Sequence, residues 1–169
     1  MADGKDSSSS VRDKLKNIFS GNSSKQNDEE VDEKLLQDLF PDDFWSCISN
    51  KSETQSNNRI SKLNSVEKII VTQVVPKSCL KRLWIESNDL LDLSSSEAIR
   101  HSYMSFLVTL IKAQYRNLGM LKLMFYNTLI EKRFTGKDDV LHIMLVIDAI
   151  TEQGKSIGYL EQDVSPQLV

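Results

Sequence analysis

The chain has 169 residues, of which 40% are hydrophobic and 27% charged, and this composition is typical of a globular protein with one domain. The net charge of −3 argues against a general nucleic-acid binder, because such a protein needs a basic surface to displace the counterions of phosphates. Two cysteines, Cys47 and Cys79, are too few for a disulfide framework, and no secretory signal or membrane-spanning apolar run is present. Together these features predict a cytoplasmic protein.

The distribution of charge divides the chain near residue 58. Residues 1–57 hold 12 acidic and 7 basic side chains and are rich in Ser and Asn, whereas residues 58–169 hold 12 acidic and 14 basic side chains. We therefore predict a partly disordered acidic segment over 1–57 and a helical domain over 58–169.

Short amphipathic helices are expected within the acidic segment. Apolar residues share one helical face over 11–19 and again over 31–40, where Asp28 is a candidate N-cap and Pro41 ends the pattern. A third apolar cluster follows at 44–48. These segments either pack onto the main domain or dock a partner by laying a helix in a groove.

From residue 58 the apolar spacing predicts five helices separated by short breaks. The first runs from Ile60 to Val74 and ends at Pro76, although the β-branched run at 69–75 could instead form a strand. The next spans about 78–91, and Ser94 with Glu97 matches a capping box that opens the third. That helix breaks near 117–119.

The last two predicted helices are delimited by glycines. The fourth begins near Leu121 and Gly136 is expected to cap its end, while Asp138 is expected to cap the start of the fifth. The fifth helix is predicted to run through Leu141, Met144, Leu145 and Asp148-Ala149-Ile150 and to end at Gly154.

The helix pairs recur at a regular interval. Predicted helices start near 58, 95 and 138, and a pair of helices about every 40 residues is typical of HEAT and armadillo solenoids. A compact six-helix bundle would fit the same spacing. Fold class is therefore all-α on either interpretation.

A resemblance favours the solenoid. Residues 97–164 resemble the N-terminal region of the tuberin family in the order and spacing of many residues, among them Glu97-Ala98, Arg100-His101, Leu107, Leu118-Gly119, Leu121, Phe125, Asp139, Val146, Ala149, Thr151, Gly154 and Tyr159-Leu160-Glu161. Asn58-Arg59-Ile60 and Trp84 also match. The resemblance implies a HEAT-like α-solenoid of stacked antiparallel helix pairs, truncated at its C-terminal end.

The resemblance also implies a function. Tuberin-type proteins form a complex with hamartin that stimulates GTP hydrolysis by the small GTPase Rheb, and this restrains the target-of-rapamycin kinase and cell growth. The implied role is a non-catalytic scaffold that supports hamartin binding, in the cytoplasm with recruitment to the lysosomal surface through the complex. The alternative is a HEAT-repeat adaptor of a related Ral-type GTPase-activating complex.

No independent active site is expected. The catalytic GTPase-activating domain of the family has no counterpart in these residues, and contact with the small GTPase is not expected from this segment. His101 and His142 have carboxylates four residues earlier, at Glu97 and Asp138, a spacing typical of helix-surface contacts. We therefore predict no catalytic, cofactor or metal site.

The candidate partner-binding residues lie on the helix after Gly119. Leu121, Phe125 and Leu129 form its apolar face, and Lys122, Tyr126 and Arg133 are expected to point away from it together. Further basic residues follow several helices and form either a solvated face or a ridge for an acidic partner or an anionic membrane: Lys77, Lys81, Arg82, Arg100, Lys112, Arg116 and Lys132.

Overall fold

A computed structural model describes residues 39–152, which form helices and no strand. The all-α expectation is thus confirmed for this part of the chain. The α-helices are α3 (Phe44–Ile48), α4 (Ser56–Ser65), α5 (Glu67–Thr72), α6 (Lys77–Ser87), α7 (Glu97–Leu118), α8 (Leu121–Glu131) and α9 (Lys137–Thr151), with 3₁₀ turns η1 (Glu53–Gln55) and η2 (Asn88–Leu91). The predictions for 1–38 and 153–169 lie outside the described residues.

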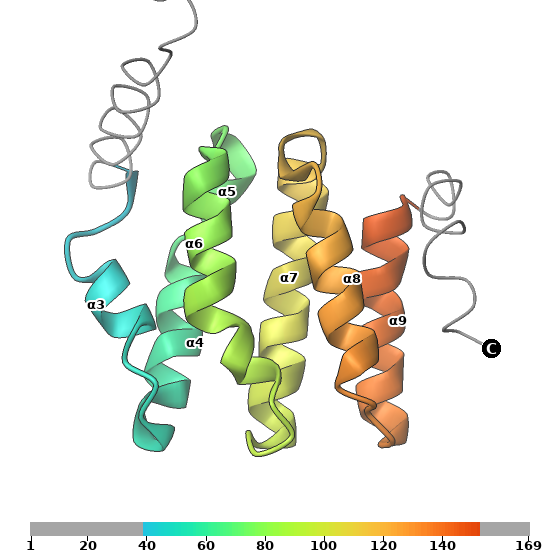
Figure 1. The fold of residues 1–169 in the computed structure, drawn as a ribbon. Coiled ribbons are helices and arrows are strands. Elements are labelled where there is room, and N and C mark those ends of the chain that lie inside the picture. Colours follow the sequence, from blue (N-terminus) through green and yellow to red (C-terminus); the bar gives the residue numbers. More distant parts are fainter. Residues whose placement is uncertain (1–38, 153–169) are drawn as a thin grey trace, which may run out of the picture.

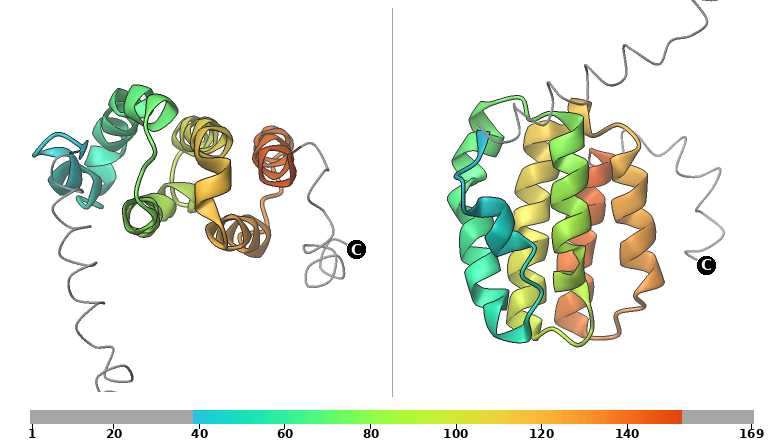
Figure 2. Two further views of the ribbon diagram at one scale, coloured as in Figure 1. Left: turned by 90° about the horizontal axis from the view of Figure 1, so that it is seen from above. Right: turned by 60° about the vertical axis from the view of Figure 1, so that its left-hand side comes forward.

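The helices form two layers. Viewed from above, α4–α5, α7 and α9 make one row, and α6 and α8 make the second row beside it (Figures 1 and 2). Successive long helices run in opposite directions, and α7 packs against α9, α5 and α4. The short links favour this antiparallel arrangement, because a parallel neighbour would require a link that runs back along the whole length of the preceding helix.

The core lies between the two layers. Trp84 of α6 meets Phe125 of α8 with ring centroids 4.4 Å apart, and both side chains are buried. Tyr103 of α7 is fully buried, and its hydroxyl lies 2.7 Å from the hydroxyl of Ser87. Burial raises the pKa of the Cys79 thiol to about 12, so this buried cysteine stays a neutral packing residue.

The first predicted helix is two helices. Val66 separates α4 from α5, and the chain becomes extended at Gln73, so Val74 is not on a packing face but is 82% exposed. Val75 is buried in its place. The strand alternative for 69–75 is wrong, because residues up to Thr72 are helical. Pro76 disfavours helical backbone at Val75, the residue before it, so a helix that continues to Val75 is disfavoured.

The predicted helix ends are correct at Gly119 but not at Ser94 and Gly136. Ser96, not Ser94, caps α7, and its hydroxyl accepts a hydrogen bond of 3.4 Å from the Ile99 N–H. Gly119 ends α7 with φ of 52°, as the predicted break implies. Gly136 does not cap the end of α8 but occupies the N-cap position of α9, and Arg133 takes the left-handed conformation after α8.

Only some of the apolar residues that predict α9 pack against its neighbours. Leu141, Met144 and Leu145 are 56–58% exposed, whereas Val146, Ala149 and Ile150 are buried against α7. The helix is apolar on nearly every side, so spacing alone could not identify the side that packs. α9 therefore presents an exposed apolar stripe at this end of the described layers.

Candidate interaction surfaces

The three predicted partner-binding residues do not form one surface. Tyr126 is only 3% exposed, and burial raises the pKa of its phenol, so the expectation that it points to solvent is wrong. Lys122 places its ammonium 3.7 Å from the ring centroid of Tyr115 on α7. Arg133 is exposed beyond the other end of α8, about 16 Å from Lys122 at the rise of a helix. Lys122 and Arg133 remain available to a partner.

The predicted basic ridge is also interrupted. Arg100 is buried, and Lys132 pairs with Asp92 in the link before α7. The lysines of α6 remain exposed. The basic residues thus divide into those in structural ion pairs and an exposed set on α6 and α7, which includes Lys112 and Arg116.

A cluster of polar side chains joins α7 to α9. The Arg100 guanidinium donates to both carboxylate oxygens of Asp139, at 3.2 Å and 2.8 Å, and also to the Ser95 carbonyl. His101 contacts the same carboxylate at 2.9 Å. The Arg100 hydrogen bonds hold the pKa of Asp139 below its usual range, so this carboxylate is ionised at neutral pH.

The two histidines of the chain belong to this cluster. Their rings stack with centroids 3.9 Å apart and an angle of 11° between planes. The predicted contact of His101 with Glu97 is confirmed, with 3.8 Å between the ring nitrogen and the carboxylate. His142 instead contacts the backbone carbonyl of Asp138 at 2.8 Å, not its carboxylate. Within residues 39–152, no group of three or more His, Cys, Asp and Glu side chains is arranged to hold a metal ion.

Arg59 makes a second buried ionic contact that the sequence reasoning did not predict. Its side chain is 1% exposed, and it donates to both oxygens of Asp89 at 2.7 Å and to the carbonyls of Ile48 and Glu86. It therefore ties α3, α4 and the end of α6 together. The sequence signal for this position is its place in Asn58-Arg59-Ile60, one of the segments on which the family resemblance rests.

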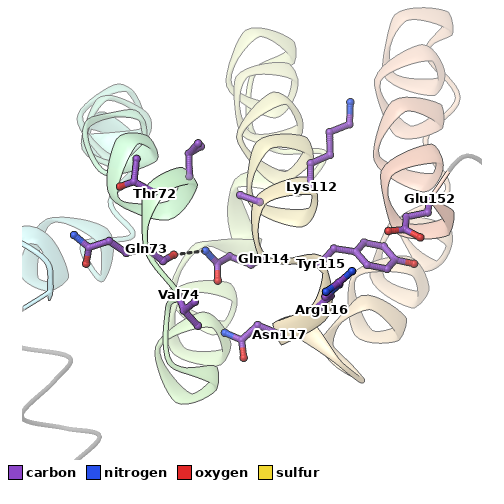
Figure 3. Close-up of a pocket in the computed structure, with 11 residues that line it drawn as sticks. Thr72, Gln73, Val74, Lys112, Gln114, Tyr115, Arg116, Asn117 and Glu152 are labelled. Carbon is purple, nitrogen blue, oxygen red and sulfur yellow. Dashed lines mark hydrogen bonds between the residues drawn. The ribbon is translucent and has the colours of Figure 1, made fainter.

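Gln114 forms the floor of an open hollow of about 620 Å³ (Figure 3). The α7 backbone departs from helical geometry here, with φ of −107° and ψ of 19°. The Gln114 amide donates to the carbonyls of Ile70 and Gln73 at 2.6 Å and 2.7 Å, and its oxygen accepts from the Val75 N–H at 3.1 Å. These hydrogen bonds satisfy backbone groups at the end of α5 and in the α5–α6 link that have no partner within a helix. The hollow is therefore explained by the way α7 holds this link.

The exposed stripe of α9 is a large apolar feature of the surface, formed by Val140, Leu141, Met144 and Leu145. Exposed apolar patches on a protein mark sites that other elements or partners cover. None of the helices within 39–152 combines the length and apolarity that crossing a bilayer requires. No helix within residues 39–152 covers this stripe, which makes it a candidate interaction surface.

The family described as "Domain of unknown function (DUF3384)" matches residues 56–169. The matched region includes α4 to α9 with both ionic clusters and continues past α9. It covers about two thirds of the sequence. The chain therefore belongs to the DUF3384 family.

Proposed function

We propose that this chain is a non-catalytic scaffold that forms the N-terminal part of a tuberin. In this role it supports the binding of hamartin and thereby the Rheb-directed GTPase-activating complex that restrains target-of-rapamycin signalling and cell growth. The DUF3384 family is typical of tuberin-like N-terminal regions, which supports the proposal.

The observation that carries the proposal is the layered array with an exposed apolar edge. Helices α4–α5 with α6, and α7 with α8, form antiparallel pairs that stack side by side (Figure 2). α9 begins a further pair, and its exposed stripe has the apolar character that a neighbouring repeat requires. We propose that the array is the start of a HEAT-like solenoid.

The proposed location follows the proposed partner. A scaffold of this kind resides in the cytoplasm and reaches the lysosomal surface through its complex. The alternative function is a HEAT-repeat adaptor of a Ral-type GTPase-activating complex, whose members share the solenoid architecture.

Capture of purified hamartin by the full-length chain tests the scaffold function. We expect capture by the folded chain, with circular dichroism confirming its helicity. Capture of the companion subunit of a Ral-type complex instead of hamartin would favour the alternative. A folded chain that captures neither protein would contradict the proposal.

Charge reversal tests the two predicted partner-binding residues that remain accessible. The variant Lys122→Glu with Arg133→Glu is expected to weaken hamartin capture by about tenfold or more, since a lost charge contact typically costs 1–2 kcal/mol at an interface. Lys68→Glu with Lys112→Glu is the matched control, because it makes the same charge change on α5 and α7. Equal weakening by both variants would show a general charge effect and remove these residues from the interface.

A Rheb hydrolysis assay tests the non-catalytic part of the proposal. The chain alone should leave the rate of GTP hydrolysis unchanged, because stimulation requires a group placed beside the γ-phosphate. Stimulation by the chain without any partner would overturn this part.

A further inference from the structure

A groove with a basic edge lies between the starts of α6 and α8. It has a volume of about 420 Å³ and is bordered by Lys77 and Lys81 of α6 and by Met120 and Met124 near α8. The two methionines are 70% and 41% exposed, and both lysines are exposed. Within residues 39–152 neither lysine forms an ion pair. The groove thus offers apolar surface beside unneutralised positive charge.

The described part of the chain begins beside α3, which contacts α6 at Arg82. Phe40 contacts the edge of the Trp45 ring at 5.7 Å between centroids, and the Arg82 guanidinium of α6 lies 4.3 Å from the Trp45 ring centroid. The Trp45 indole nitrogen is buried and has no hydrogen-bond acceptor in the described part of the chain. The described chain therefore begins close to the Arg82 side of α6, near a buried N–H that has no acceptor among residues 39–152.

The segment directly before this entry point has the complementary composition. Residues 28–38 contain six carboxylates and one lysine, and Val31 and Leu35 are spaced to share one helical face. Eleven residues span about 16 Å as a helix and more than 30 Å when extended. Since a helix is about 10–12 Å wide, the segment is long enough to cross α6 and reach the groove.

We propose that residues 28–38 bind in cis across the outward face of α6 and into the α6–α8 groove. Their carboxylates neutralise Lys77, Lys81 and Arg82, while Val31 and Leu35 contact the two methionines. Flexible methionine side chains suit such an amphipathic ligand, and opposite charges fix its register. The acidic segment then acts as an internal cover that any other ligand of this groove must displace.

Zero-length carbodiimide cross-linking of the full-length chain locates the contact. The reagent joins a carboxylate to an amine only when the two touch, so monomeric protein should yield peptides that link 28–38 to Lys77 or Lys81. Lys68 and Lys112 on α5 and α7 are equally exposed and provide the internal comparison. Links to all four lysines in similar yield would overturn the proposal.

Mixed isotopic labels separate the possible occupants. When labelled and unlabelled chains are combined, the proposed contact gives links within one chain only. Links between chains would assign the groove to the acidic segment of a second copy and overturn binding in cis. The absence of any link from 28–38 to α6 would also overturn it.

Hydrogen exchange provides the energetic test. Amides of 28–38 should exchange about tenfold more slowly in the native chain than in Lys77→Glu with Lys81→Glu. The control Lys68→Glu with Lys112→Glu should retain the protection, and circular dichroism checks that every variant is folded.

Charge exchange completes the test. Adding Glu29→Lys and Glu30→Lys to the Lys77→Glu, Lys81→Glu variant should restore most of the protection, because the opposite charges are again paired. Protection that is indifferent to the α6 charges, or that the exchanged variant fails to regain, would overturn the proposed contact. None of these measurements depends on hamartin capture. The proposed contact of residues 28–38 and the proposed scaffold function can therefore be contradicted separately.

Discussion

Arg59 brings a permanent positive charge into the protein interior, and the chain provides four hydrogen bonds to hold it there. The planar guanidinium reaches a carboxylate and two carbonyls at once, from three different elements. A lysine can supply the charge but not this fork of donors. At the scale of single residues, this geometry fixes the N-terminal end of the fold.

Replacing Arg59 tests this assignment. Arg59→Lys is expected to lower the free energy of unfolding by about 3–5 kcal/mol, because Asp89 and the two carbonyls lose partners in a buried setting. Urea denaturation followed by circular dichroism measures the change. Lys62→Ala on the same helix, which removes an ion pair with exposed Asp43, should cost much less. Equal losses of unfolding free energy in the two variants would show that the buried Arg59 network stabilises the fold no more than an exposed ion pair does.

Asp139 makes the stability dependent on pH in the acid range. Its pKa is lowered in the folded state, so the stabilisation is complete above the unfolded pKa and is lost as pH falls through the folded value. Asp139→Asn should destabilise the chain by on the order of 2–4 kcal/mol at neutral pH, since Arg100 loses its carboxylate. The difference from the native chain should shrink as pH falls below about 4. A difference independent of pH would contradict the assignment.

At the scale of elements, α7 holds the array together through its kink. Gln114 leaves the helical ladder and makes three hydrogen bonds to backbone groups, one in α5 at Ile70 and two in the α5–α6 link. Asn117, one turn later, donates to the Val75 carbonyl. The backbone groups of the link thus form with α7 the hydrogen bonds that they do not form within a helix of their own.

Removing this side chain should loosen the link. Gln114→Ala is expected to cost about 2–4 kcal/mol of unfolding free energy, because the Val75 N–H and the Ile70 carbonyl become buried and unpaired. Lys112→Ala on the exposed side of the same helix is the control. Faster hydrogen exchange confined to residues 70–75 would accompany the change, whereas unaltered exchange there would contradict the proposed anchor.

The sequence predicts the elements better than their packing. The helical period and the breaks at Pro76 and Gly119 predict where α6 and α7 lie, because both signals are local. The side of α9 that packs was not predictable, since that helix is apolar all round. Arg59 and Ile48 lie 11 positions apart, and the other contacts of Arg59, Gln114 and Asp139 join residues at least 27 positions apart, with no spacing rule to identify them.

At the scale of the whole molecule, the described layers end in an apolar edge. Leu141, Met144 and Leu145 are more than half exposed on α9. Such an edge is expected where a solenoid continues into another repeat. Its exposure predicts self-association and dye binding by the isolated chain.

Polar substitution of the edge tests this expectation. Met144→Glu with Leu145→Glu should reduce binding of a hydrophobic dye and light scattering severalfold, while unfolding free energy changes by less than about 1 kcal/mol. The control Val71→Glu with Val74→Glu alters exposed residues near α5 and should leave both signals nearly unchanged. A large loss of stability in the α9 variant would show that the edge is covered within the chain.

The stacked pair of histidines has a practical consequence. The sequence contains two histidines in total, and both lie where α7 meets α9. Each ring lies in the ring-current field of the other, so the carbon-bound proton resonances of both rings, two from each, should be displaced while the helices are in contact. A simple proton spectrum therefore reports, without any label, whether the junction stays closed when a partner binds.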